Sequence, residues 1–188
     1  MVEENPFTQL YGSIWKMLEL WPGFEGLVCV GNRIKFSGEN RDPMKKEILT
    51  ADLPEVRVVP SGGAMNLHVT NKESNIKKSF QIQVSTGDQR VDAVGTELSG
   101  EDELIKVNVG LFPVEWEILR ALTTWSETIY KLTWKGEEFV KDLSVVGLTE
   151  GASQADLNRG IRGWSAVVTI QVDMYFENSV LGTEDEGS

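Results

Sequence analysis

An unbroken alternation of apolar and polar residues near the C-terminal end is the feature that most constrains how this chain can fold. Apolar residues occupy every second position over thirteen residues: Trp164, Ala166, Val168, Ile170, Val172, Met174 and Phe176. A period of two places all of them on one face of a β-strand, with polar residues such as Thr169, Gln171 and Asp173 on the other face. The chain therefore contains a sheet with one buried face and one polar face, and this segment supplies a long strand of it.

Two amphipathic helices are expected to cover the buried face. Asn5 and Pro6 fit the N-cap and first position of a helix over residues 6–20, which Trp21-Pro22-Gly23 stops. A second helix is predicted from about Pro113 to Tyr130. Its apolar stripe consists of Val114, Ile118, Leu122, Trp125 and Ile129, and its polar residues Glu115, Glu117, Arg120 and Glu127 are expected largely elsewhere.

The remaining segments predict further strands and long loops. A hairpin is expected at Leu27–Phe36 around Gly31-Asn32, and strands at Glu55–Val59 and Lys78–Ser85. Residues 37–54, 61–77 and the acidic stretch 86–108 are interpreted as loops, the last of them mobile, while Leu132–Trp134 and Phe139–Val146 fit either short strands or loop. This order predicts an α+β fold with a mostly antiparallel mixed sheet. Residues 1–176 are expected to form one domain and residues 177–188 a disordered acidic tail.

Charge and composition exclude several classes of protein. The 188 residues hold 18 Lys and Arg against 29 Asp and Glu, a net charge of −11, which disfavours sequence-specific nucleic-acid binding. Cys29 is the only cysteine, so the chain has no internal disulfide. No apolar run reaches the roughly 20 residues of a membrane span, and Glu3 and Glu4 stand where a signal peptide would be basic. We therefore expect a protein that folds in a reducing interior, with no membrane as a partner.

Motifs that would indicate an enzyme or a cofactor are absent from the sequence. His68 is the only histidine, and no nucleophile elbow, phosphate-binding loop, dinucleotide fingerprint or zinc-protease motif is present. The acidic pairs Glu137-Glu138 and Glu101-Asp102-Glu103 could serve a glycosidase, but an acid-rich chain produces such pairs by chance. We predict no catalytic residue, no metal site and no cofactor.

Aromatic and basic residues supply candidate contacts with partners. Six tryptophans are present; Trp125 and Trp164 fall on core stripes, whereas Trp15, Trp116 and Trp134 fall less clearly on buried faces. At least one of these three is expected in a protein interface, and ordinary core packing is an equal alternative. Arg159 and Arg162 form a basic pair in an acidic third of the chain and are candidate partner contacts.

The order of elements resembles that of the tail terminators of long-tailed bacteriophages, the lambda-type minor tail proteins. The resemblance is carried by the helix at Phe7–Leu20, the hairpin Leu27–Phe36, the strand entry Asp52-Leu53-Pro54-Glu55-Val56-Arg57-Val58, the strand Phe80–Val84, the helix Pro113–Tyr130 and the closing strand from Arg162-Gly163-Trp164 to Tyr175. The resemblance covers most of residues 6–176 and rests on the order of the elements and their residue patterns, not on a signature motif. The chain carries extra material at about 61–77, 86–108 and 132–160.

The resemblance implies a structural role in the phage neck. A tail terminator forms a homohexameric ring that caps the tail tube, ends tail polymerisation and presents a surface for head–tail joining. The implied partners are further copies of the chain, the tail tube protein and a head-completion or stopper protein, and the implied location is the virion, after assembly in the host cytoplasm. DNA passes through such a ring without sequence-specific binding. An acidic lumen would repel its phosphates, and the candidate lumen residues are Asp88, Asp92, Glu97, Glu101, Asp102 and Glu103.

Two other classes of function remain open at this stage. Within the neck class, a different protein, for tail completion or head–tail joining, also fits. The first of the two other classes is a binding module that uses tryptophans to hold a carbohydrate or a protein. The other is a small acid–base enzyme built on Asp and Glu pairs, which would need a pocket that separates the pKa values of two carboxyl groups.

Overall fold

The computed structural model describes residues 5–28, 54–67, 73–87, 91–99, 104–152 and 163–177. The helices are α1 (Pro6–Glu19), α2 (Leu111–Thr124) and α3 (Glu127–Tyr130), with a 3-10 turn η1 (Pro22–Phe24) after α1. The strands are β1 (Glu55–Leu67), β2 (Glu73–Thr86), β3 (Val94–Ser99), β4 (Leu104–Val109), β5 (Thr133–Trp134), β6 (Glu137–Glu138), β7 (Val140–Ala152) and β8 (Trp164–Glu177).

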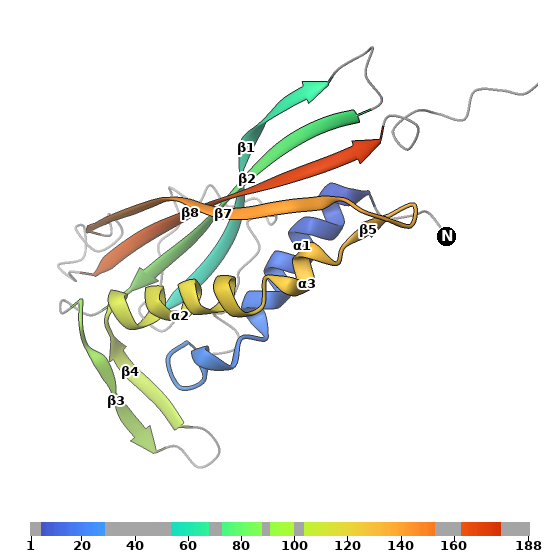
Figure 1. The fold of residues 1–188 in the computed structure, drawn as a ribbon. Helices are drawn as coiled ribbons and strands as arrows, with labels where there is room; N and C mark the ends of the chain where they lie inside the picture. Colours follow the sequence, from blue (N-terminus) through green and yellow to red (C-terminus); the bar gives the residue numbers. More distant parts are fainter. Residues whose placement is uncertain are drawn as a thin grey trace, which may run out of the picture.

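A four-stranded antiparallel sheet in the order β1-β2-β8-β7 is the centre of the fold, and the helices lie together across one of its faces (Figure 1). β3 and β4 pair with each other in a separate hairpin, which projects beyond α2 and away from the sheet. β5 and β6 form a second, two-residue hairpin. The predicted α+β class and the antiparallel sheet are confirmed.

The alternation that predicts the long strand is reproduced in β8. Its even-numbered residues from Ala166 to Phe176 are buried and their neighbours are partly exposed. β2 follows the same rule with Phe80, Ile82 and Val84, and both strands pack these side chains against α2. Tyr11 of α1 lies on the same core, stacked on Phe80, and its hydroxyl donates a hydrogen bond to the Val58 carbonyl at 3.2 Å. One core between sheet and helices results.

The first helix is confirmed together with its predicted start. The Asn5 side chain accepts a hydrogen bond from the Thr8 amide at 2.9 Å, and Pro6 occupies the first turn. The predicted hairpin at Leu27–Phe36 does not begin where it was expected. Leu27 and Val28 lie in a turn that closes η1, with the Val28 amide donating to the Phe24 carbonyl at 3.0 Å, and the rest of the segment lies outside the described residues.

The loop predicted at 61–77 is wrong over most of its length, because β1 continues to Leu67 and β2 begins at Glu73. Pro60, which cannot donate to a ladder, falls at a bulge where the register shifts between Pro60 and Gly62. Gly62 has a φ of +115°, which a side chain would oppose, and a Cβ at Gly63 would collide with the Lys77 carbonyl. The glycines that suggested a loop are therefore what allows this strand to continue.

The acidic loop predicted at 86–108 is also wrong, since it contains the hairpin of β3 and β4. The missed signal is the alternation of Ile105, Val107 and Val109 with Lys106 and Asn108. The pairing sets Glu97 opposite Lys106 in the backbone register.

The second predicted helix is divided in two. α2 starts two residues early, at Leu111, and ends at Thr124, where Trp125 leaves the helix at a φ of −106° and α3 follows after Ser126. The Trp125 ring then meets the Trp21 ring edge to face, with centroids 5.1 Å apart. Three helices rather than two therefore cover the sheet.

The segment that fitted either strand or loop at Phe139–Val146 forms the long edge strand β7, which runs to Ala152. Its register against β8 shifts twice, between Val140 and Asp142 and between Val145 and Gly147. Two bulges in thirteen residues break the simple alternation, so the sequence period that signals a strand is lost.

Candidate functional site

Exposed large apolar side chains gather on two elements of the described chain. Of the seven that the described residues contain, five lie on α2 and β7: Phe112, Trp116, Val145, Val146 and Leu148. Trp116 is 62 % exposed, the highest value in this group. Scattered exposed apolar residues are ordinary, whereas a gathering of them on neighbouring elements marks an interaction surface.

The register of β7 explains why its apolar residues are exposed. Residues paired across two strands share a face, and five β7 residues pair with buried residues of β8: Val140 with Met174, Leu143 with Val172, Val145 with Ile170, Leu148 with Val168 and Glu150 with Ala166. Val145 and Leu148 thus point to the side that carries the helices. They stay half exposed because β7 is the edge of the sheet and α2 packs on β2 and β8 instead.

One exposed flank of α2 is apolar as well. Phe112 and Trp116 are one turn apart, and Leu119 follows on the same side of the helix. Glu115 lies at the border between this flank and the buried face. We call Phe112, Trp116 and Leu119 of α2, with Val145 and Leu148 of β7, the α2–β7 face.

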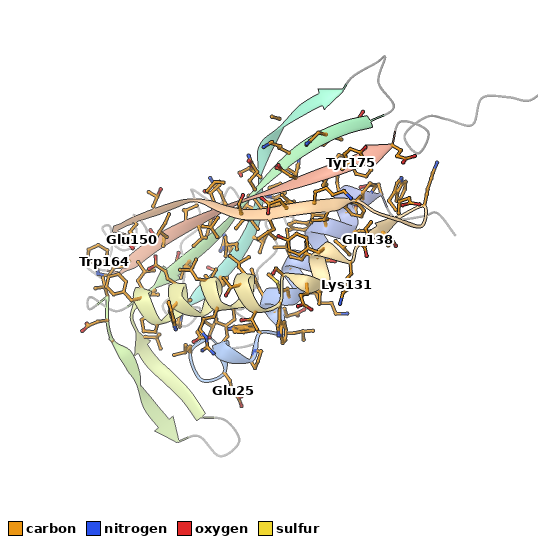
Figure 2. The ribbon with its side chains drawn as sticks, in the orientation of Figure 1. Glu25, Lys131, Glu138, Glu150, Trp164 and Tyr175 are labelled. Carbon is orange, nitrogen blue, oxygen red and sulfur yellow. The ribbon has the colours of Figure 1, made fainter. Side chains whose placement is uncertain are left out.

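Two carboxyl groups meet at the margin of the α2–β7 face. The Glu115 side chain is buried, only 6 % exposed, and its Oε1 has no hydrogen-bond partner among the described residues. Burial raises the pKa of the Glu115 carboxyl from its usual 4.5 to about 7, and the negative charge of Glu150 adds to the shift. Figure 2 shows Glu150, near Trp164, beside the end where α2 begins. An apolar face with a buried acid therefore suits a partner that brings a positive charge.

The opposite flank of α2 is closed by a polar network within the chain. The Trp21 indole donates to Glu117 Oε2 at 2.9 Å, and Arg120 forms an ion pair with Glu117 Oε1 at 2.8 Å. Arg120 also lies over the Trp21 ring, 5.9 Å from its centroid. A Cβ at Gly23 would collide with the Glu117 carboxylate, so glycine is required there. This network fixes η1 against α2.

The placement of Glu115 and Glu117 corrects the predicted polar face of the second helix. Both were expected away from the apolar stripe, yet both are buried, at 6 % and 8 % exposure. Arg120 and Glu127 are exposed, as expected. The reason is that the buried part of α2 extends beyond the predicted stripe, because the sheet covers one side of the helix and η1 covers another.

A groove lies along the outer side of α1, at a distance from the α2–β7 face. It has a volume of about 460 Å³ and is lined by Thr8, Gln9, Tyr11, Gly12, Ser13, Trp15 and Lys16 of α1 together with Leu132, which follows α3. We call it the α1 groove. Its lining contains two aromatic rings and one cation, Lys16, but no carboxylate.

Few of the sequence-predicted contact residues lie in the described part of the structure. Asp88, Glu101, Asp102, Glu103, Arg159 and Arg162 lie outside the described residues, as do His68 and Cys29. Asp92 is exposed in the turn before β3, and Glu97 lies within β3. Of the aromatic candidates, Trp116 is exposed, Trp15 and Trp134 are partly buried, and Trp125 and Trp164 pack against the core.

A metal centre is not assembled from the described residues. They include no group of three or more His, Cys, Asp or Glu side chains that could hold a metal ion. Glu137 and Glu138 are both exposed on the β5–β6 hairpin. None of the helices in this part of the chain is long and apolar enough to cross a membrane. The α2–β7 face and the α1 groove are therefore the candidate binding surfaces of the described chain.

Comparison with known proteins adds no relative. No protein-family model matches the chain, and no curated protein matches it either. The fold defines an α+β protein with a four-stranded antiparallel sheet and one helical layer, and its function is argued from its own surfaces.

Proposed function

We propose that this protein is a structural component of a bacteriophage neck, which forms a ring on the end of the tail tube. In this role it ends tail polymerisation and presents the surface on which the head is joined. The observation that carries the proposal is the α2–β7 face, an exposed apolar surface with Trp116 at 62 % exposure. An exposed apolar surface of this kind is explained if other subunits cover it in an assembly.

The partners in this proposal are further copies of the chain, the tail tube protein and a head-completion protein. A ring that forms on the tube end needs a contact between subunits that closes by rotation, and two further surfaces for the tube and the head. The resemblance of the element order to tail terminators supports the same role. The protein would be assembled in the host cytoplasm and retained in the virion.

The β3–β4 hairpin is the candidate element for the lumen. It projects away from the sheet (Figure 1), and the acidic residues Asp92 and Glu97 lie in or just before β3. Negative charge along a lumen would repel the phosphates of passing DNA, so that DNA slides without binding. A ring with this hairpin on its outer rim would contradict the assignment.

Light scattering after size exclusion, followed by negative-stain imaging, tests the proposal on the full chain. We expect a closed ring, with a central hole that duplex DNA can pass, either in the free protein at high concentration with Mg²⁺ or after addition of tail tubes. A chain that stays monomeric in both settings and does not bind tube ends would refute the neck function.

Trp116 also favours a second candidate, a module that binds carbohydrate through an exposed aromatic ring. Such a ring can stack on the apolar face of a sugar, and binding would quench tryptophan fluorescence. Titration with a panel of oligosaccharides should change the fluorescence of the native chain but not that of Trp116→Ala. Unchanged fluorescence across the panel would exclude the carbohydrate-binding function and leave assembly as the proposed function.

A further inference from the structure

Gly12 occupies an unexpected position in the middle of α1. A glycine inside a helix costs roughly 0.5–1 kcal/mol relative to alanine, because it loses more backbone freedom on folding. A Cβ built at Gly12 meets no atom of the described chain within 4 Å. Nothing in the described subunit therefore requires glycine here, in contrast to Gly23 and Gly63, where a Cβ would collide with neighbours.

A glycine at position 12 is explained if another molecule approaches α1 closely at this point. Gly12 lies in the lining of the α1 groove, between Tyr11 and Trp15 and beside Lys16. A missing side chain deepens the groove at this point, and aromatic walls favour an aromatic or aliphatic guest. The cation at its rim favours a guest that carries a negative charge.

The α2–β7 face has the properties that the α1 groove lacks. Phe112 and Trp116 project from it at 45 % and 62 % exposure, one helical turn apart. Glu115 and Glu150 at its margin are acidic, whereas the groove contributes Lys16 and no carboxylate. The two surfaces are therefore complementary in shape and in charge.

We propose that the two surfaces are the two halves of one contact between copies of this chain: Phe112 and Trp116 of one subunit enter the α1 groove of the next, over Gly12, and Glu150 approaches Lys16. This inference rests on the proposed function and names the subunit contact of the ring. Two different surfaces on each subunit make the contact heterologous, which closes into a ring when the rotation allows it.

The location of the two surfaces suits a head-to-tail contact. Figure 2 shows Glu150 at one end of the molecule and Lys131, the neighbour of the groove residue Leu132, toward the other end. The two surfaces therefore lie apart on the subunit, with the start of α2 near Glu150 and α1 crossing the middle of the molecule (Figure 1). Aromatic side chains bury about 150–250 Å² each when fully covered. Because Phe112 and Trp116 are 45 % and 62 % exposed, they can supply about a quarter of the roughly 800 Å² that each partner of a stable interface buries. Leu148 and Val145 extend the same face.

Filling the groove tests the contact without removing any interaction in the subunit. Gly12→Leu has open space for its side chain, so we expect an unchanged or higher melting temperature and at least about a tenfold rise in the concentration needed for half-assembly. Trp116→Ser should have the same effect from the other surface. Gly12→Ala is the matched control, since it stabilises the helix but leaves most of the groove open.

Reversal of charge gives a second test that does not depend on packing. Lys16→Glu and Glu150→Lys should each weaken assembly, and the two changes combined in one chain should restore it, because each contact then regains opposite charges. All variants are compared with the native chain by light scattering at matched salt concentrations.

The outcomes separate this contact from the proposed function. If the native chain forms rings and Gly12→Leu forms them equally well, the contact is wrong while the ring function stands. If Gly12→Leu unfolds the isolated subunit, another part of the same chain covers the groove and the contact is again wrong. If the native chain forms no ring even with tail tubes, both are refuted.

Discussion

The two flanks of α2 carry acids that are equally buried and have opposite surroundings. Glu117 accepts hydrogen bonds from Trp21 and Arg120, and Gly23 gives it room. Glu115 has an oxygen with no hydrogen-bond partner in the described chain and has Glu150 as a neighbour. A buried acid that is satisfied within the chain stabilises its own fold. A buried acid that is left unsatisfied lowers stability.

The tryptophans of the two flanks differ in the same way. Trp21 is 4 % exposed, hydrogen-bonded and packed against Trp125, whereas Trp116 is 62 % exposed. One flank therefore serves folding and the other is available for contact. Each of the following experiments contrasts one flank with the other.

The largest effect is expected for Trp21→Ala. The substitution empties a buried site and leaves Glu117 without its indole donor, so the free energy of unfolding should fall by about 3–5 kcal/mol in urea denaturation. Trp116→Ala on the exposed flank is the control and should change it by about 0.5 kcal/mol or less. Equal losses for the two variants would show that both flanks are part of the folded core.

A smaller effect, which depends on pH, is expected for Glu115→Gln. The pKa of Glu115 is raised to about 7 in the folded chain, so between about pH 4.5 and 7 the native state retains a proton that the unfolded state has released. The free energy of unfolding therefore falls as pH rises through this window. Glutamine removes that fall, and at pH 8 the variant should be more stable by on the order of 2–3 kcal/mol.

Urea denaturation at a series of pH values from 5 to 8 measures this difference between the variant and the native chain. Glu127→Gln, which replaces an exposed carboxylate of α3, is the matched control. The same slope in Glu115→Gln as in the native chain would contradict a protonated Glu115.

The smallest effect is expected for Arg120→Ala. Arg120 pairs with Glu117 and lies over Trp21, but its side chain is 52 % exposed, so solvent weakens both interactions. The loss should be about 0.5–1 kcal/mol, measured by thermal unfolding. Lys131→Ala removes the exposed ion pair with Glu127, whose charged atoms are 3.9 Å apart, and should cost less stability. A larger loss for Lys131→Ala than for Arg120→Ala would show that the Arg120 network is no stronger than an ordinary surface ion pair.

Elements whose side chains follow a single period were predictable from the sequence. β8 and α1 were found with nearly correct limits, because regular alternation in one and an Asn5-Pro6 start in the other are independent of the rest of the fold. The sheet order was not predictable, since it depends on which strands pair across long stretches of chain.

The remaining elements and most of the candidate site were not predicted, because irregular strand pairing breaks the residue period that indicates a strand. The bulges of β7 shift Val145 and Leu148 onto the same face although they are three residues apart, so no alternation remains to be read. The burial of Glu117 depends on η1, and part of the pKa shift of Glu115 depends on Glu150 of β7, and both come from other parts of the chain. The exposed aromatic candidate Trp116 was among the three named from the sequence, but its neighbours in the face were not.

The interruption of β1 at Pro60 also affects what happens when many copies are crowded together. An outer strand can recruit the outer strand of another molecule and continue as an endless ribbon, but only if both margins of the sheet present an even row of amides and carbonyls. Here Pro60 lacks an amide hydrogen, and bulges disturb both β1 and β7. These interruptions oppose the edge-to-edge addition of further strands at each margin, which lowers the tendency of the chain to form fibres at high concentration.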